Sequence, residues 1–368
     1  MNDPSTTPSV NPIREFGLLY SRFCNAACAH CGSNSGPVER GRMPMELVER
    51  CVADVAGLGV RSVMVSGGEP LAFFADIRQV AGLAHAAGLG VQVCSNGFWG
   101  DRPDRARSWL GQLQERGLEQ LLLSTDRYHL EFVPLRSVIT AAQAASELGI
   151  PCQIAVPATA RDWRAGALVA ALQRETDAHV QTHPVHPVGR GEGLAAHHFR
   201  WPTLQVGPCH LVGHVEVDAD GTVSVCPTSA DFDRRSPLIL GNVTTDRLAT
   251  LLARFQATPL FAVISRWGPL GLHVLASGTA DTRMLGLADR LHDCHLCRSL
   301  TRDDAVAARV AARHGVDLLE PVPPGGLETI LEQVATALTA AAGQRPGAAQ
   351  PVGAPGSTPA ASPSTIQS

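Results

Sequence analysis

Short apolar runs recur along the first half of the chain at a nearly regular interval. They are FGLLYS (16–21), RSVMVSG (61–67), LGVQVCS (89–95), LEQLLLS (118–124), IPCQIAV (150–156) and DAHVQTH (177–183). After a longer first gap, the runs start about 30 residues apart, which is the length of one strand–helix unit. The intervals therefore predict a chain of repeated βα units.

The segments between these runs carry helical patterns, as in MELVERCVADVAGLG (45–59) and LRSVITAAQAASELG (135–149). Apolar strands that alternate with amphipathic helices are typical of a parallel sheet covered by helices. Six units are fewer than the eight of a closed barrel. We therefore expect an α/β fold, a partial (β/α)6 barrel over residues 13–199.

The regular spacing of the apolar runs ends near residue 200. GPCHLVGHVEVDADGTVSVCP (207–227) contains two alternating segments joined by Asp220 and Gly221, which is a hairpin signal. We expect a small cysteine-rich α+β domain over 200–300, followed by C-terminal helices over 301–342. Residues 1–12 and the Ala/Pro/Gly/Ser-rich tail 343–368 lack periodic apolar positions and are predicted to be disordered.

Charge and composition limit the possible binding partners and the cellular location of the protein. The formal net charge is −4, so no basic field predicts a nucleic-acid partner or an anionic membrane. No signal peptide is recognisable, and we expect no segment apolar enough to span a bilayer. The predicted location is the reducing cytoplasm, where disulfides are rare. The ten cysteines of the chain therefore indicate metal or redox chemistry.

Polar residues follow the ends of the predicted strands. Cys24 follows the first strand, Gly67 to Pro70 the second, Ser95 to Gly97 the third and Ser124 to Asp126 the fourth. Parallel α/β folds place their chemistry at the carboxyl edge of the sheet. This edge is therefore the expected active face.

Three cysteines stand close together on that face, Cys24, Cys28 and Cys31 in CNAACAHC. Three thiolates leave one iron of a [4Fe–4S] cluster with an open position, as a catalytic zinc site keeps one position free. A zinc site that borrows a distant histidine and a set of buried, unligated cysteines are the alternatives.

The C-x3-C-x2-C motif resembles the signature of the radical S-adenosylmethionine (SAM) superfamily. The resemblance spans about residues 17–190 and implies that the open iron binds SAM, whose cleavage gives a 5′-deoxyadenosyl radical. VSGGEPL (65–71), CSNG (94–97), LSTD (123–126) and PVHPVGRG (184–191) are similar to further family segments. The implied cofactor-binding residues are Gly67, Gly68, Glu69, Pro70, Ser95, Asn96, Ser124, Asp126, Arg190 and, beside the adenine, His30.

Four more cysteines lie outside the barrel, Cys209, Cys226, Cys294 and Cys297. Four thiolates saturate a cubane or a tetrahedral zinc. The region resembles the Twitch form of the SPASM extension, which implies one auxiliary [4Fe–4S] cluster; a zinc clamp is the alternative. His210, His214 and His295 are possible substitute ligands. Cys51, Cys94 and Cys152 are expected to be buried, inert thiols.

An auxiliary cluster implies an electron acceptor and hence net oxidation of the substrate. One substrate class is a ribosomally made precursor peptide, presented by a separate leader-peptide recognition protein. The other is a small-molecule alcohol such as an aminocyclitol or sugar. The resemblance also implies a flavodoxin- or ferredoxin-type electron donor. A catalytically inactive metal-binding scaffold is a further alternative.

Substrate contacts are expected on two loops, STDRYHLEFVP (124–134) and THPVHPVGRGEG (182–193). Their ring-bearing and basic side chains are Tyr128, His129, His183, His186 and Arg190. His129 is the first choice for a catalytic role toward the substrate.

Overall fold

The computed structural model describes residues 11–199, 206–227, 236–286, 289 and 292–343. The predicted disorder of 1–10 and 344–368 lies outside these residues. The prediction was wrong for Asn11, which is buried: its side-chain amide donates to the carbonyl oxygens of Phe255 and Thr258, both at 3.1 Å. It was also wrong for Gly343, the last residue of a helix.

The expected parallel barrel strands are present. They are β1 (Glu15–Ser21), β2 (Ser62–Gly67), β3 (Gly90–Ser95), β4 (Leu118–Ser124), β5 (Cys152–Ala158) and β6 (His179–Pro184). Consecutive strands pair in parallel from β1 to β6. The periodicity of the sequence therefore predicted the number and order of the six strands, although short 3₁₀ turns and not an α-helix follow β6.

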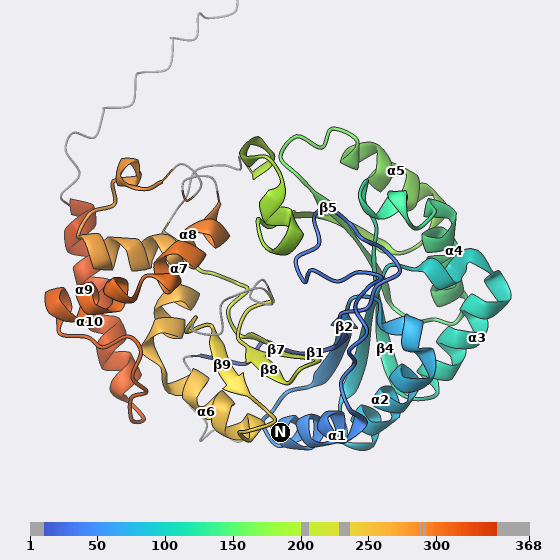
Figure 1. Ribbon diagram of the computed structural model, residues 1–368, viewed down its shortest axis with the longest axis horizontal. Coiled ribbons are helices and arrows are strands. Elements are labelled where there is room, and N and C mark those ends of the chain that lie inside the picture. The colour runs from blue at the N-terminus through green and yellow to red at the C-terminus, as the bar shows by residue number, and fades with distance from the viewer. Residues whose placement is uncertain (1–10, 200–205, 228–235, 287–288, 290–291, 344–368) are drawn as a thin grey trace, which may run out of the picture.

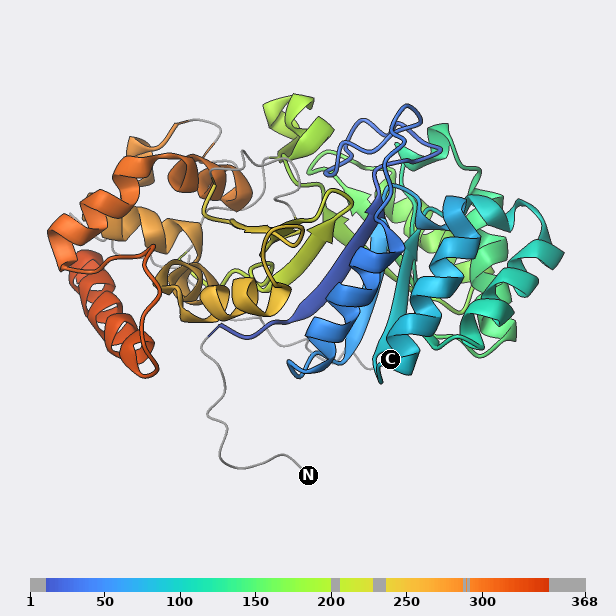
Figure 2. The ribbon, with the colours of Figure 1, turned by 60° about the horizontal axis from the view of Figure 1, so that its bottom comes forward.

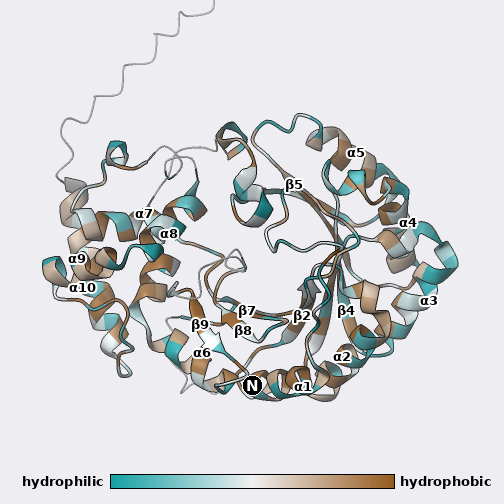
Figure 3. Cartoon of the chain, viewed as in Figure 1, coloured by the Kyte–Doolittle hydropathy of each residue, from teal (hydrophilic) through white to brown (hydrophobic). Residues whose placement is uncertain are grey.

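Helices cover the convex side of this sheet (Figure 1). They are α1 (Met45–Ala56), α2 (Phe74–Ala86), α3 (Pro103–Gln114), α4 (Leu135–Glu147) and α5 (Ala165–Glu175). Alternate strand residues, such as Val63 and Val65 of β2, are fully buried beneath the helices. The apolar colouring of the strands in Figure 3 follows this core, whereas the outer helix surfaces are more hydrophilic.

The predicted hairpin extends the same sheet. β7 (His214–Asp218) pairs in parallel with β1, and β8 (Thr222–Ser224) and β9 (Ile239–Asn242) continue it antiparallel. The strand order is β6-β5-β4-β3-β2-β1-β7-β8-β9. The region predicted as a second domain therefore shares its sheet with the barrel, as Figure 2 shows from the side.

The remaining helices pack beyond β9. They are α6 (Leu248–Ala257), α7 (Pro259–Ser277), α8 (Asp293–Arg302), α9 (Asp304–His314) and α10 (Gly326–Gly343). Among the described residues α7 alone is long and apolar enough to cross a membrane, contrary to our expectation of no such segment. However, 78% of it is buried in the fold and its backbone is broken at Gly268, so its composition is that of a core helix.

Candidate functional site

Cys24, Cys28 and Cys31 line one cavity of about 200 Å³ at the carboxyl ends of the first four strands. Cys24 and Cys28 are buried, Cys31 is half-buried, and all three are free thiols. The loop that holds them is fixed by its own backbone, since the Cys31 N–H donates to the Cys28 carbonyl at 3.1 Å and that of Cys24 to Gly36 at 3.1 Å. The local motif therefore produces a compact three-thiol surface.

The glycines after β2 bring a second loop against the cysteine loop. A Cβ atom at Gly67 would lie 2.4 Å from the Ser21 carbonyl oxygen, and one at Gly68 would lie 2.1 Å from that of Phe23. The Gly68 and Glu69 N–H groups donate to the same two oxygens at 2.7 and 2.8 Å. Only glycine permits this approach, and both glycines line the cavity.

Glu69 lies just behind the lining of the cavity, where its carboxylate contacts the lining residues Ser95 and Asn96. Its carboxylate is fully buried and accepts hydrogen bonds from the Leu71 N–H (3.1 Å), the Ser95 hydroxyl (2.8 Å) and the Asn96 N–H (2.8 Å). Burial raises the pKa of Glu69 to about 7, although these hydrogen bonds lower it. Glu69 thus ties the glycine loop to the end of β3.

Ser95 and Pro70 also have structural contacts. The Ser95 hydroxyl accepts from the Gly97 N–H (3.1 Å) and the Trp99 indole (2.9 Å) while it donates to Glu69. Its hydrogen-bonding capacity is therefore used within the protein, although Ser95 lines the cavity. Pro70 is buried at the start of a short 3₁₀ turn and lies outside the lining.

Asn96 and Ser124 remain facing the cavity. The Asn96 side-chain amide lies 2.8 Å from the Asn25 side-chain oxygen and 3.8 Å from the Cys24 sulfur. Asn96 therefore positions the first cysteine as well as lining the cavity.

Asp126 organises a ring cluster at one side of the cavity. It is buried, and its carboxylate lies 2.9 Å from Nε2 of His30 and 3.1 Å from Nδ1 of His129. The N–H groups of Tyr128 and His129 donate to it at 2.7 and 2.9 Å. Burial would raise the pKa of Asp126, but pairing with His129 and His30 outweighs it and holds the pKa well below its ordinary value.

His30 stacks on Tyr128 with ring centroids 4.8 Å apart, and both His30 and His129 line the cavity. Cys28, His30 and His129 also place one potential metal-ligating atom each within 4.8 Å of the others. Tyr128 supports the cluster from outside the lining, and His183 is exposed in β6, also outside it. Of the predicted substrate contacts, His129 and Arg190 reach the cavity.

Arg190 connects the loop over residues 182–193 to the loop that holds the three cysteines. Its N–H donates to the Cys31 carbonyl and its Nε to the Cys28 carbonyl, both at 2.9 Å. Its buried Nη2 atom has no hydrogen-bond partner among the described residues. Burial raises the pKa of Cys24 to about 11 and that of Cys28 to about 12. Three thiols on one cavity, two of which are held in the neutral form by burial, lie beside a spare guanidinium N–H, and this donor set fits an iron–sulfur cluster with an anionic ligand.

Cys94 was expected to be a buried, inert thiol; burial does raise its pKa to about 11, but its position in the cavity was not predicted. It points into the cavity from β3, next to Ser66 of β2, and both residues line it. The strand alternation places Cys94 on the opposite face from the buried Val93, and this inward position was readable from the pattern. Cys51 is buried in α1, as expected.

The second cysteine set is assembled from separate segments. Burial raises the pKa of Cys294 well above its usual value, and the nearby thiols of Cys226, Cys297 and Cys209 raise it further. The four thiols therefore share one region of the fold. Four thiol donors fit a fully ligated cluster or a tetrahedral metal.

His186 lies beside the second cysteine set, a position that the sequence did not predict. His186 Nδ1 lies 3.5 Å from the Cys294 sulfur, and His186, His292 and Cys294 place their ligating atoms within 4.8 Å. His214 pairs instead with Glu15 at 2.8 Å, so the structure does not support its expected role as a substitute ligand. His186 precedes Arg190 on the same loop, so this loop contacts both cysteine sets.

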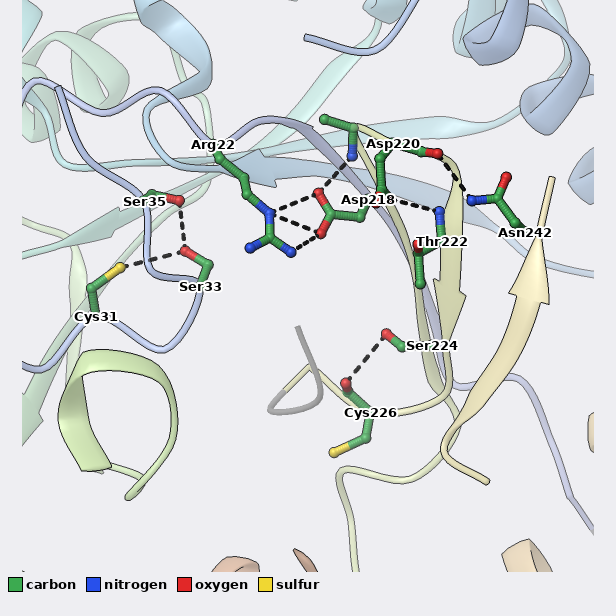
Figure 4. A network of polar contacts seen from close by, with 11 residues as sticks. Arg22, Cys31, Ser33, Ser35, Asp218, Asp220, Thr222, Ser224, Cys226 and Asn242 are labelled. Carbon is green, nitrogen blue, oxygen red and sulfur yellow. Dashed lines mark hydrogen bonds and ion pairs between the residues drawn. The ribbon is translucent and has the colours of Figure 1, made fainter. Parts of the chain in front are cut away.

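An arginine–carboxylate pair joins the cysteine loop to β7. Nε of Arg22 lies 3.1 and 3.3 Å from the two carboxylate oxygens of Asp218, and Nη2 also contacts this carboxylate. Figure 4 shows this pair together with Cys31 and Cys226. The pair fixes the end of β7 against the loop of the first set.

Comparison with known proteins identifies the first half of the chain. A family model described as the radical SAM superfamily matches residues 18–156. GTP 3′,8-cyclase of Chlorobaculum tepidum is 31% identical over 111 residues, 30% of this chain and 32% of that protein. AdoMet-dependent heme synthase of Methanosarcina barkeri is 33% identical over 89 residues, 24% of this chain and 25% of that protein. The matches thus span about a third or less of either relative.

Solved structures of similar fold include anSMEcpe with bound AdoMet, at 17% identity and a TM-score of 0.49 over 65% of this chain and 80% of that one. BtrN in complex with AdoMet and 2-DOIA has 16% identity and a TM-score of 0.43, over 70% of this chain and 88% of that one. The family match includes all three cysteines of the cavity, so residues 18–156 of this chain match a radical SAM domain.

Proposed function

We propose that the chain is an enzyme that holds a [4Fe–4S] cluster on Cys24, Cys28 and Cys31 and binds SAM at the open iron. When bound, this pair supplies a 5′-deoxyadenosyl radical that removes a hydrogen atom from the substrate. The observation that carries the proposal is that all three thiols line one cavity with the glycine loop and Arg190.

Residues around the cavity would bind the rest of SAM and the substrate. Arg190 offers the buried Nη2 donor to an anionic group such as the methionine carboxylate. Gly67 and Gly68 leave the wall of the cavity open to a ligand, and Ser124 adds a hydroxyl. His129, held by Asp126, takes the substrate-side position.

We further propose that Cys209, Cys226, Cys294 and Cys297 hold an auxiliary [4Fe–4S] cluster that accepts an electron from the substrate. The proximity of the four thiols supports it, as does the loop from His186 to Arg190 that contacts both sets. A zinc clamp would use the same donors and leave the substrate without this electron acceptor.

The proposed reaction is an oxidative modification of a ribosomally made precursor peptide, with reducing electrons supplied by a flavodoxin- or ferredoxin-type partner. Dehydrogenation of a small-molecule alcohol uses the same chemistry. The exposed side chains of Leu130 and Phe132, on the loop that carries His129, favour a substrate that extends beyond the cavity.

The experiment is to purify the protein without oxygen, measure iron and sulfide, and incubate it with SAM and dithionite. We expect about eight irons per chain from two cubanes, and formation of 5′-deoxyadenosine. About four irons with cofactor cleavage would remove the auxiliary cluster from the proposal. Iron without cleavage, or no iron after reconstitution, would contradict the catalytic proposal and favour a metal-binding scaffold.

A further inference from the structure

A continuous row of residues lies on the concave face of the sheet, below the cysteine cavity. Glu216 of β7 pairs in register with Gly17 of β1, which pairs with Met64 of β2; Met64 pairs with Gln92 of β3, and Gln92 with Gln120 of β4. In-register neighbours of a parallel sheet project to the same face. The row therefore crosses five adjacent strands, of which β7, β1, β2 and β4 are labelled in Figure 1.

This row faces the same space as the cavity. Ser66, Cys94 and Ser124 line the cavity. Met64 and Gln92 precede the first two by two residues, and Gln120 precedes Ser124 by four. Side chains two residues apart on a strand share a face and are separated by about 6.6 Å. The row thus forms the next layer beneath the cavity.

The layer is unusually rich in amides. Gln153 of β5 pairs with Leu122, whose side chain faces the same way as that of Gln120, and Gln181 of β6 pairs with Ala155. All four glutamines are half-buried. Gln92 makes one long hydrogen bond, 3.4 Å to Ser62, and the structure gives the amides of Gln120, Gln153 and Gln181 no hydrogen bond to a described residue. These amide groups are available to a ligand.

Glu216 is the one carboxylate in this layer. Its side chain lies over Gly17, where an added Cβ would come within 3.3 Å of the Glu216 Cγ atom. The absence of a side chain at Gly17 therefore makes the space that Glu216 occupies. Its half-buried position leaves it in contact with solvent on the concave face.

The charged groups around Glu216 already have partners. Asp218, on the same face of β7, is paired with Arg22, and Glu15 is paired with His214 at 2.8 Å. Across the sheet Glu216 faces Ser224 of β8. Within the described part of the chain no cation pairs with Glu216, and burial, followed by repulsion from Asp218 and Glu15, raises its pKa to about 8.

We propose that this layer is the substrate floor of the enzyme, in which Glu216 binds a protonated amine of the substrate while the glutamines farther along the same face, from Gln92 of β3 onward, bind its neutral polar groups. An ammonium has three donors and no acceptor, so the ionised carboxylate of Glu216 matches it, and the bound cation favours this ionised form over the neutral acid. The inference rests on the proposed function and narrows its substrate class to polar amines. The amine can come from a lysine side chain of a peptide or from an amino sugar or aminocyclitol.

The test is a calorimetric titration of the reconstituted protein with matched probes in the presence of SAM. Glucosamine is compared with glucose, and Nα-acetyl-lysine amide with Nα-acetyl-glutamine amide. We expect one amine to bind at least about tenfold more tightly than its neutral match, because hydrogen bonds to a charged group are among the strong ones. Preference for glucosamine identifies a small-molecule substrate, and preference for the lysine derivative identifies a peptide.

Glu216→Gln should abolish the preference, whereas Glu119→Gln, an exposed glutamate on the other face of β4, should retain it. A preference that persists in Glu216→Gln, or the absence of any amine preference in the wild-type protein, would overturn the inference. Iron content and 5′-deoxyadenosine formation are measured on the same samples. They report on the proposed function separately, because Glu216 touches neither cysteine set.

Discussion

The two cysteine sets are built in opposite ways. The first comes from one loop, and its three members line a cavity together with three other strand ends. The second joins the start and end of a hairpin to a helix that begins at Asp293. Three donors beside open space suit a site that binds a further ligand, whereas four thiols gathered in one region of the fold suit a closed site.

The surroundings of the two sets differ as well. Arg190 and the Asp126 cluster place charged groups beside the first set. The second set is bordered by His186 and His292, whose pKa values burial lowers to about 4 and about 3, so that both are neutral at neutral pH. The two sets thus differ in their nearest basic groups, which are an arginine with a free N–H donor at the first set and neutral imidazoles at the second.

The largest expected effect comes from breaking the first set. Cys28→Ser should lower the iron content by about four atoms per chain and abolish 5′-deoxyadenosine formation, because the cubane loses one of its three protein ligands. Cys51→Ser, in a buried thiol of α1, serves as the control and should retain both. Iron analysis and chromatography of the reaction products measure the two quantities.

Removing a cysteine of the second set should separate cleavage of SAM from oxidation of the substrate. Cys297→Ala is expected to remove about four irons while 5′-deoxyadenosine still forms, now without oxidation of substrate. Loss of zinc instead of iron would show that the second set is a structural clamp. Loss of cofactor cleavage as well would show that the two sets do not act independently.

The close packing of the glycine loop against the cysteine loop can be tested by adding a Cβ atom at Gly68. Gly68→Ala should lower the free energy of unfolding by about 3 kcal/mol, since the added Cβ meets the Phe23 carbonyl at 2.1 Å. The matched control is Gly111→Ala in α3, where nothing lies within 4 Å of the new Cβ and a small stabilisation is expected. Equal effects of the two changes in denaturant unfolding would contradict the close packing of this loop.

A smaller loss of stability is expected when the charge of Asp126, beside the first cysteine set, is removed. Asp126→Asn should lower the free energy of unfolding by about 1.5 kcal/mol at pH 7. The folded protein holds the pKa of Asp126 below its unfolded value, so the stabilisation is present above pH ~4 and is lost as the pH falls further. Urea unfolding of both proteins between pH 7 and 3 measures this, and a difference that grows toward low pH would contradict it.

The regular spacing of apolar runs predicted the barrel because strand and helix periods are local properties. The extension of its sheet by β7 was not predicted, since parallel pairing of β7 with β1 joins segments far apart in the chain. The same limit applies to Asn11, whose partners lie at the end of α6 and just beyond it.

For the site, the contiguous motif placed Cys24, Cys28 and Cys31 together, and the strand ends placed Gly67 and Asn96 beside them. The direction of the Glu69 carboxylate depends on donors from β3 and could not be read from its own segment. The place of His186 beside Cys294, instead of in the cavity, and the position of Glu216 could not be predicted for the same reason, because both depend on neighbours that only the folded chain supplies.

The most direct test of the account is electron paramagnetic resonance of the reduced protein before and after addition of SAM. A cluster with an open iron on the first set predicts that SAM changes the spectrum, in the wild-type protein and equally in Cys297→Ala. A spectrum that SAM leaves unchanged, or a protein that contains zinc and no iron–sulfur signal, would contradict the central claim.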